Sequence, residues 1–173
     1  MSQNTCTRCN RALKDPQSVK RGMGPICYRE LGGGIFEADM EVDEKEWARR
    51  DELLRHGGEV DFGVNWQYPI EGNLLPTLYT LRVSVRFKDE NFEAYGIVTG
   101  PGKNEEVIFT STPDIKAAYR AAIDAGPRCS AEAFQAWKQG AREARKMMQK
   151  SGINRATCVK RRDGTSSPGR DYT

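Results

Sequence analysis

The sequence predicts an α+β protein that begins with a small zinc knuckle. Three of its five cysteines fall within the first 27 residues, in a stretch too poor in apolar residues to bury a core of its own. Residues 78–88 alternate between apolar and polar side chains, which is typical of a half-buried strand. Together with helix signals on both sides of this strand region, these patterns predict a knuckle, a helix, a three-stranded antiparallel meander and two C-terminal helices.

The first helix and the strands have clear start and stop signals. Residues 43–56 predict a helix with Asp43 as its N-cap and Gly57-Gly58 after its end. Residues 59–76 contain prolines and glycines among scattered aromatics, so we expect an ordered loop there. The expected strands are 78–88, 92–99 and 105–110, joined by turns at Asp89-Glu90-Asn91 and at 100–104.

The C-terminal region predicts two helices and a tail. The first starts near Thr112, with Pro113 at its first position, and ends at Gly126-Pro127. The second runs from Ser130 to about Lys150. Residues 153–173 are polar and basic and predict a disordered tail. We therefore divide the chain into a zinc-binding segment (1–34), an α+β domain (35–152) and a flexible basic tail (153–173).

Composition predicts a cytoplasmic protein without a membrane span. Hydrophobic residues make up 38%, the mean hydropathy is −0.70, and no apolar run is long enough to cross a bilayer. In a reducing cytosol, an odd number of cysteines with a Cys-x2-Cys pair favours a metal site over a disulfide framework.

Charge is unevenly distributed along the chain. Residues 1–34 have a net charge of +4, residues 35–61 of −6 and residues 129–173 of +6. Two explanations are open: the basic ends contact an anionic partner, or they close onto the acidic middle of the same chain.

Cys6, Cys9 and Cys27 are the candidate zinc ligands. Thiolates at i and i+3 can face one ion from a tight turn, and Cys27 follows a Gly-Pro turn into a short helix whose first amides should favour its thiolate. A closed structural zinc site needs four ligands. The candidates for the fourth are Cys129 and His56, which we prefer, and Glu30, Cys158 or a water molecule. Thiols without metal and a redox pair are the alternatives, the latter disfavoured because no βαβ unit surrounds Cys6 and Cys9.

This segment resembles a short zinc-finger-like domain of unknown function found in phage, plasmid and bacterial proteins. The resemblance rests on Cys6-x2-Cys9-Asn10-Arg11-x-Leu13-x-Asp15-Pro16-x-Ser18 followed by Gly22-x-Gly24-Pro25-x-Cys27. Asn10 replaces the usual glycine, and asparagine tolerates the same left-handed conformation. The resemblance covers residues 5–31 and implies metal binding and a mobile-element origin, but no reaction.

Basic residues near the C-terminus are the candidate nucleic-acid contacts. Phe134, Trp137, Ala141, Ala144 and Met148 form one apolar stripe, which we expect to pack on the core. The basic candidates on the rest of that helix and in the tail are Lys138, Arg142, Arg145, Lys146, Lys150, Arg155, Lys160, Arg161 and Arg162.

Two other surfaces have both a functional and a structural explanation. Arg82, Arg86 and Lys88 line one strand face and could bind single strands beside Tyr95, but pairing with neighbouring glutamates is the preferred explanation. The acidic run 37–46 could hold a cation, but it also suits the lead-in to a helix.

The sequence contains no P-loop, nucleophile elbow or His-Glu-x2-His motif, and only one histidine, so we expect no enzymatic activity. The preferred function is a zinc-containing nucleic-acid-binding accessory protein. The alternative is an adaptor or inhibitor that contacts a host protein through the segments 37–46 and 62–68.

Overall fold

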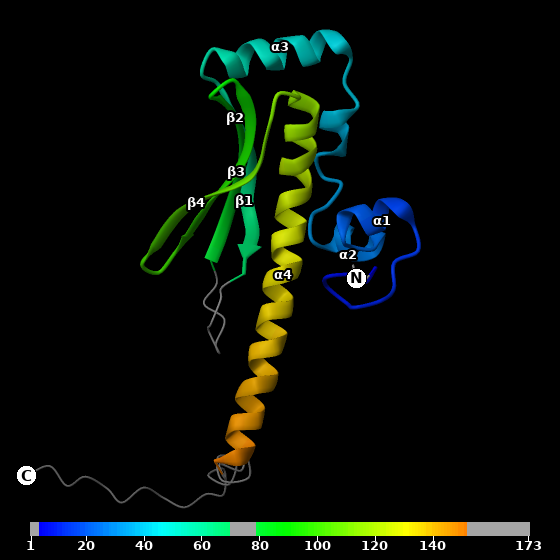
Figure 1. Cartoon of the computed structure of the whole chain (residues 1–173), viewed down its shortest axis with the longest axis vertical. Helices are drawn as coiled ribbons and strands as arrows, with labels where there is room; N and C mark the ends of the chain where they lie inside the picture. The colour runs from blue at the N-terminus through cyan, green and yellow to red at the C-terminus, as the bar shows by residue number, and fades with distance from the viewer. Residues whose placement is uncertain (1–3, 70–78, 152–173) are drawn as a thin grey trace, which may run out of the picture.

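A four-stranded sheet, a long helix and a small N-terminal module are the main parts of the computed structural model, which describes residues 4–69 and 79–151 (Figure 1). The elements are α1 (Pro16–Arg21), α2 (Pro25–Glu30), the 3-10 helix η1 (Glu37–Met40), α3 (Glu44–Arg55), β1 (Glu59–Tyr68), β2 (Tyr79–Lys88), β3 (Asn91–Gly100), β4 (Lys103–Thr112) and α4 (Ile115–Lys150). The antiparallel sheet has the order β1-β2-β3-β4. α4 packs along the sheet, and the N-terminal module, residues 4–34, lies against its other side. The expected α+β class is confirmed.

The strand β1 corrects the expectation of a loop at its position. Glu59–Tyr68 pairs with β2, and the side chains of Phe62 and Trp66 are only 3% and 6% exposed. The pairing register shifts on both sides of Gly63, whose φ of 100° belongs to the left-handed half of conformational space. This irregularity disturbs the alternation that identifies a strand in sequence. Residues 70–76 of the expected loop lie outside the described residues.

The other three strands lie where strands were expected, but with β1 the antiparallel sheet has four strands and not three. Of the five apolar residues of β2 predicted to share one side, Leu81, Val83 and Val85 are buried, and Tyr79 and Phe87 are half-buried. Asp89 and Glu90 connect β2 to β3 and both have positive φ, 48° and 61°. A two-residue turn of this kind matches the right-handed twist of the paired strands. Gly102, with φ of 71°, closes the turn between β3 and β4 after Pro101.

The two expected C-terminal helices are one continuous helix, α4, so the predicted break at Gly126-Pro127 is wrong. Pro127 has no amide hydrogen for the carbonyl four residues earlier, and such a residue usually ends or kinks a helix. Here Gly126 serves close packing instead, because a Cβ on it would lie 2.2 Å from the Trp66 ring. Pro127 is itself fully buried. The helix continues through this pair, and both residues are buried.

The main core lies between α4 and the sheet, and α3 covers one end of it. Tyr119 of α4 meets Trp47 of α3 and Phe62 of β1 edge to face, with ring centroids 5.1 and 5.6 Å apart. A second, smaller cluster joins the N-terminal module to Ala131 of α4. The start of α4 is thus covered on two sides.

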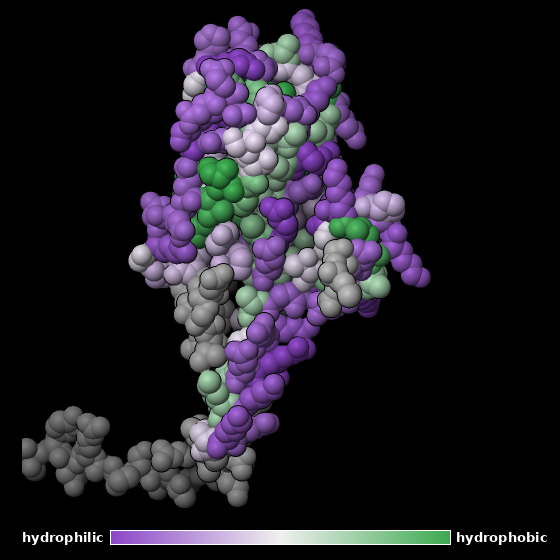
Figure 2. Space-filling model, viewed as in Figure 1, coloured by the Kyte–Doolittle hydropathy of each residue, from purple (hydrophilic) through white to green (hydrophobic). Residues whose placement is uncertain are grey.

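The end of α4 extends beyond both the sheet and the module (Figures 1 and 2). We call residues 136–150 the stem. Trp137, Met147 and Met148 are 47%, 58% and 56% exposed. The expectation that the apolar stripe packs on the core is therefore wrong for this part of the helix. Among the residues that the structure describes, no helix, α4 included, is both long and apolar enough to cross a membrane.

Candidate metal centre

A tight turn in the N-terminal module positions Cys6 and Cys9. The amide of Asn10 donates to the Cys6 carbonyl oxygen at 2.8 Å, and the Cys6 amide donates to the Arg11 carbonyl oxygen at 2.8 Å. Asn10 has a φ of 61°, the left-handed conformation expected for this position. The chain thereby reverses within five residues and brings both cysteines to one side.

Two short helices bring Cys27 to the same place. Asp15 caps α1 by accepting a hydrogen bond from the Ser18 amide at 2.8 Å, and α1 ends at Gly22 with φ of 69°. The amide and hydroxyl of Thr7 both donate to the Gly22 carbonyl oxygen, at 2.9 and 2.7 Å. These bonds tie the Cys6–Asn10 turn to the turn that precedes α2, the helix that carries Cys27.

The sulfur atoms of Cys6, Cys9 and Cys27 all lie within 4.8 Å of one another. Three thiolates bound to one tetrahedral zinc ion would be about 3.8 Å apart, given Zn–S bonds of about 2.3 Å. The cluster could therefore hold a metal ion with small adjustments. Cys6 is buried, Cys27 is half-buried and Cys9 is exposed, so the site lies at the edge of the module.

The cysteines differ in acidity. Burial raises the pKa of the Cys6 thiol, but backbone hydrogen bonds at Gly24, Cys9 and Arg8 outweigh burial and lower it to about 7. Burial and the neighbouring thiols raise the pKa of Cys27 to about 11. Neighbouring thiolates repel one another, and a divalent cation is the group that stabilises all three together.

The candidates for a fourth ligand lie elsewhere or have other partners. Among the described residues, the cluster of close ligand atoms contains only the three cysteines. Cys129 lies in the main core, where burial raises the pKa of its thiol to about 11. His56 follows α3, and its Nδ1 is 2.7 Å from the Glu52 carbonyl oxygen. The carboxylate of Glu30 pairs with the Arg8 guanidinium. Cys158 lies outside the described residues.

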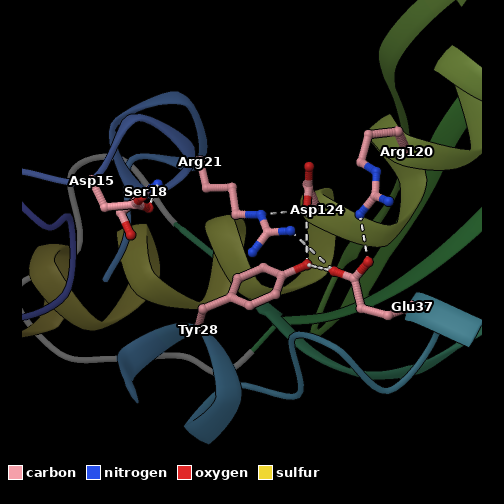
Figure 3. Close-up of polar contacts among 7 residues, drawn as sticks. All are labelled: Asp15, Ser18, Arg21, Tyr28, Glu37, Arg120 and Asp124. Carbon is pink, nitrogen blue, oxygen red and sulfur yellow. Dashed lines mark hydrogen bonds and ion pairs between the residues drawn. The ribbon is translucent and has the colours of Figure 1, made fainter. Parts of the chain in front are cut away.

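The module docks onto α4 through a half-buried polar network (Figure 3). The hydroxyl of Tyr28, next to Cys27 in α2, donates to Asp124 Oδ1 at 2.8 Å. Arg21 Nη2 and Arg120 Nη1 lie 3.2 and 2.8 Å from the two carboxylate oxygens of Glu37. Burial, and next the hydrogen bond to Asp124, raises the pKa of Tyr28. The network links the turns that carry the clustered cysteines to α4.

Most of the acidic run 37–46 is used in internal contacts. Glu37 pairs with Arg21 and Arg120, Asp39 and Glu46 pair with Arg50, and Glu44 pairs with Lys116, while Asp43 caps α3 as predicted. The Arg21–Glu37 pair shows that the basic N-terminal segment does close onto the acidic middle of the chain at this point. Phe62 and Trp66, proposed as a contact loop, are buried in β1.

The arginines of the sheet are also paired, as preferred from the sequence. Arg86 Nη2 lies 2.9 Å from Glu93 and 2.7 Å from Glu106, and the guanidinium covers the ring of Tyr95 at 4.2 Å. Arg82 Nη2 lies 2.6 Å from Asp61. Tyr95 is only 4% exposed, so this face offers no open aromatic ring for a base.

The five predicted contacts within α4 are brought together on the stem. Lys138, Arg142, Arg145, Lys146 and Lys150 lie on residues 136–150, and none forms an ion pair with another described residue. Four of them are exposed, and Lys138 is half-buried. The other predicted contacts, Arg155, Lys160, Arg161 and Arg162, lie outside the described residues.

Sequence reasoning missed the docking contact between Tyr28 and Asp124. One signal was available: Asp124 lies among alanines on the buried part of α4, where an acidic side chain needs a partner. It also missed the exposure of Trp137, because helical spacing shows which residues share a side but not where their packing partner ends.

Comparison with known proteins concerns the module alone. Residues 3–32 match a family of unknown function (DUF6011), a range that contains all three clustered cysteines and both short helices. No curated protein and no solved structure matches the chain. The N-terminal module is thus similar to a domain family to which no activity is assigned.

Proposed function

We propose that this protein is a non-enzymatic, zinc-containing nucleic-acid-binding protein that holds phosphate groups with the basic side of its stem. The observation that carries the proposal is the contrast between paired and unpaired cations. We call the described residues outside the module and the stem the body. Arg50, Arg82 and Arg86 are neutralised by carboxylates of the body. The stem has five cations and only one acidic residue, Glu143, which accepts a hydrogen bond from Gln139.

The spacing of the stem cations places them in line with the module. Gln135, Lys138, Arg142 and Arg145 follow one another at intervals of three or four residues and therefore share one side of α4. Gln135 Nε2 donates to the carbonyl oxygen of Arg8 in the module. The row of cations thus begins at the module, and Figure 2 shows hydrophilic side chains continuing along that side of the stem.

The module, which contacts Gln135 through Arg8, has further positive charge. Its exposed cations without an ion pair to a described residue are Arg11, Lys14, Lys20 and Arg29. Phosphate recognition by charge requires neutralising groups along a track and little fixed geometry. A surface that runs from the module onto the stem meets this requirement.

Zinc has a structural role in this proposal. The three thiolates of Cys6, Cys9 and Cys27 would hold the ion, and the ion would stabilise the turns on which the module depends. A rigid module keeps Tyr28 against Asp124 and hence keeps the module cations beside the stem. Metal binding would therefore support nucleic-acid binding without contacting the nucleic acid.

The test is the salt dependence of binding to fluorescently labelled oligonucleotides, measured by anisotropy with the purified full-length chain. If about four to five phosphates are neutralised, the slope of log Kobs against log salt should be about −3 to −4.5. Binding that is flat with salt, or no binding at low salt, would contradict the proposal. In the latter case, recovery of one host protein from nuclease-treated lysate would favour the adaptor alternative.

A further inference from the structure

Two exposed aromatic rings lie where α4 leaves the body. Phe134 and Trp137 are 36% and 47% exposed, and their ring centroids are 5.9 Å apart with an interplanar angle of 34°. The other tryptophans of the chain, Trp47 and Trp66, are only 4% and 6% exposed. Aromatic rings of this size are usually buried, so their exposure as a pair requires an explanation.

The pair lies on the continuation of the helix side that faces the sheet. Ser130 Oγ accepts a hydrogen bond from the Gln67 amide of β1 at 3.0 Å, which places Ser130 against the end of that strand. Phe134 and Trp137 follow Ser130 by four and seven residues and share its side of α4. β1 ends at Tyr68, one residue after its contact with Ser130, so the turns of α4 that carry the two rings come after the end of this strand.

Positive charge flanks the two rings. The Arg8 guanidinium carbon lies 5.9 Å from the centroid of the Phe134 ring. Lys138 directly follows Trp137, and Arg145 lies seven residues further along the same row of cations. Arg8 is already paired with Glu30, but Lys138 and Arg145 have no ion pair with a described residue. Exposed rings beside these two cations match the two components of single-strand recognition, a stacking surface and a phosphate track.

We propose that Phe134 and Trp137 form a stacking platform for the bases of a single-stranded nucleic acid. The inference deepens the proposed function and rests on it, because the stem cations must first hold the phosphates. Bases in a duplex stack on one another and offer no free faces to rings on an exposed helix. Unpaired bases present both faces, and stacking on an aromatic side chain tolerates every base. The platform therefore selects single strands without selecting a sequence.

The experiment compares an oligothymidine of about 20 nucleotides with a duplex of the same length, using the intact zinc-loaded chain. Trp137→Leu removes the larger ring and keeps an apolar side chain. Met148→Ala alters the same stripe further along and serves as the matched control. Affinity is measured by anisotropy, and intrinsic tryptophan fluorescence gives an independent signal. Trp137 should dominate the response to a stacked base because the other two tryptophans are buried.

We expect Trp137→Leu to weaken binding of the single strand about tenfold or more and to change duplex binding less than about twofold. Saturation with oligothymidine should quench the fluorescence of the unmodified chain and of Met148→Ala, but not that of Trp137→Leu. Equal weakening for both nucleic acids, or saturation without quenching, overturns the platform and leaves the proposed function intact. Absence of salt-dependent binding to either nucleic acid overturns both.

Discussion

α4 has apolar, basic and small residues along its whole length. These residues have different surroundings in the first part of the helix, residues 115–135, and in the stem. In the first part, Tyr119 and Ile123 are buried in the main core, and Asp124 accepts a hydrogen bond from the module. In the stem, Trp137 and Met148 are exposed, and Arg142 has no ion pair with a described residue. Helical periodicity sets which residues share a side. The extent of the neighbouring sheet and module decides whether that side is buried.

Removal of the proposed zinc ion should have the largest effect on stability. Without the ion the module should unfold, and the side of α4 that the module covers would become exposed, as the stem is. In small zinc domains the apparent free energy of metal binding is about 10 kcal/mol or more. This free energy stabilises the fold, because the unfolded chain has no preformed metal site. Chelation, or Cys6→Ser, should abolish amide protection in residues 4–34 and lower it around Asp124, while β2 and β3 keep theirs. Hydrogen exchange read by mass spectrometry measures this.

The controls for metal removal are Cys129 and His56, which lie outside the cluster. Cys129→Ala and His56→Ala should leave the metal content of the purified chain unchanged, since neither side chain belongs to the cluster. Loss of stoichiometric zinc in either variant would show that a side chain outside the three-cysteine cluster is a ligand. Absence of metal from the purified wild-type chain would contradict the proposal that zinc stabilises the module.

Two tryptophan substitutions compare the two parts of the helix, since Trp66 of β1 packs on the first part and Trp137 lies on the stem. Trp66→Ala should lower the free energy of unfolding by about 3–5 kcal/mol, because the ring is buried against Gly126. Trp137→Ala should change it by less than about 0.5 kcal/mol, as expected for a surface substitution. Urea unfolding curves give both values. Similar costs for the two substitutions would mean that the stem is packed as tightly as the body.

Added side-chain volume should likewise destabilise the protein more in the first part of α4 than in the stem. Gly126→Ala introduces a methyl group 2.2 Å from the Trp66 ring and should cost about 2–3 kcal/mol by overpacking. Ala144→Leu adds more volume on the stem and should be nearly neutral, because leucine is also a good helix former. Thermal unfolding monitored by circular dichroism is sufficient. A neutral Gly126→Ala would refute the close approach of α4 to β1.

Loss of the Tyr28 hydroxyl should have the smallest effect and should depend on pH. Tyr28→Phe leaves the Asp124 carboxylate without this donor and should cost about 1–2 kcal/mol. Since the pKa of Tyr28 is raised in the fold, its contribution is complete below about pH 10 and is lost as pH rises above that value. Stability measured from pH 8 to 11 should therefore fall more steeply in the unmodified chain than in Tyr28→Phe. Parallel curves would contradict a docking role for this hydroxyl.

Local signals in the sequence predicted the elements whose ends are set by nearby residues. Asp43 and Gly57 bound α3, and the alternation of β2 identified its buried side. The proximity of Cys6, Cys9 and Cys27 also followed from local turns. The errors arose where a distant residue decides the structure. Gly126 resembles a helix end in sequence, but it is required because Trp66, 60 residues earlier, packs on it.

Strand β1 and the stem were mispredicted for related reasons. The register shifts around Gly63 hide the alternation of β1, and pairing with β2 supplies the order that the local pattern lacks. The apolar stripe of α4 has the spacing of a core-facing helix throughout, so its sequence cannot show that Trp137 is exposed. Tertiary context decides both cases.

The most direct test of the account removes the same charge from two places. Arg142→Ala, Arg145→Ala and Lys146→Ala together remove three exposed cations from the stem, and Lys45→Ala, Arg49→Ala and Lys88→Ala remove three exposed cations from the body. At low salt the stem variant should bind oligonucleotides at least about tenfold more weakly than the unmodified chain, with a salt slope reduced by about 2–3. The affinity of the body variant should differ from that of the unmodified chain by less than about threefold. Equal weakening by the two variants would contradict the assignment of nucleic-acid binding to the stem.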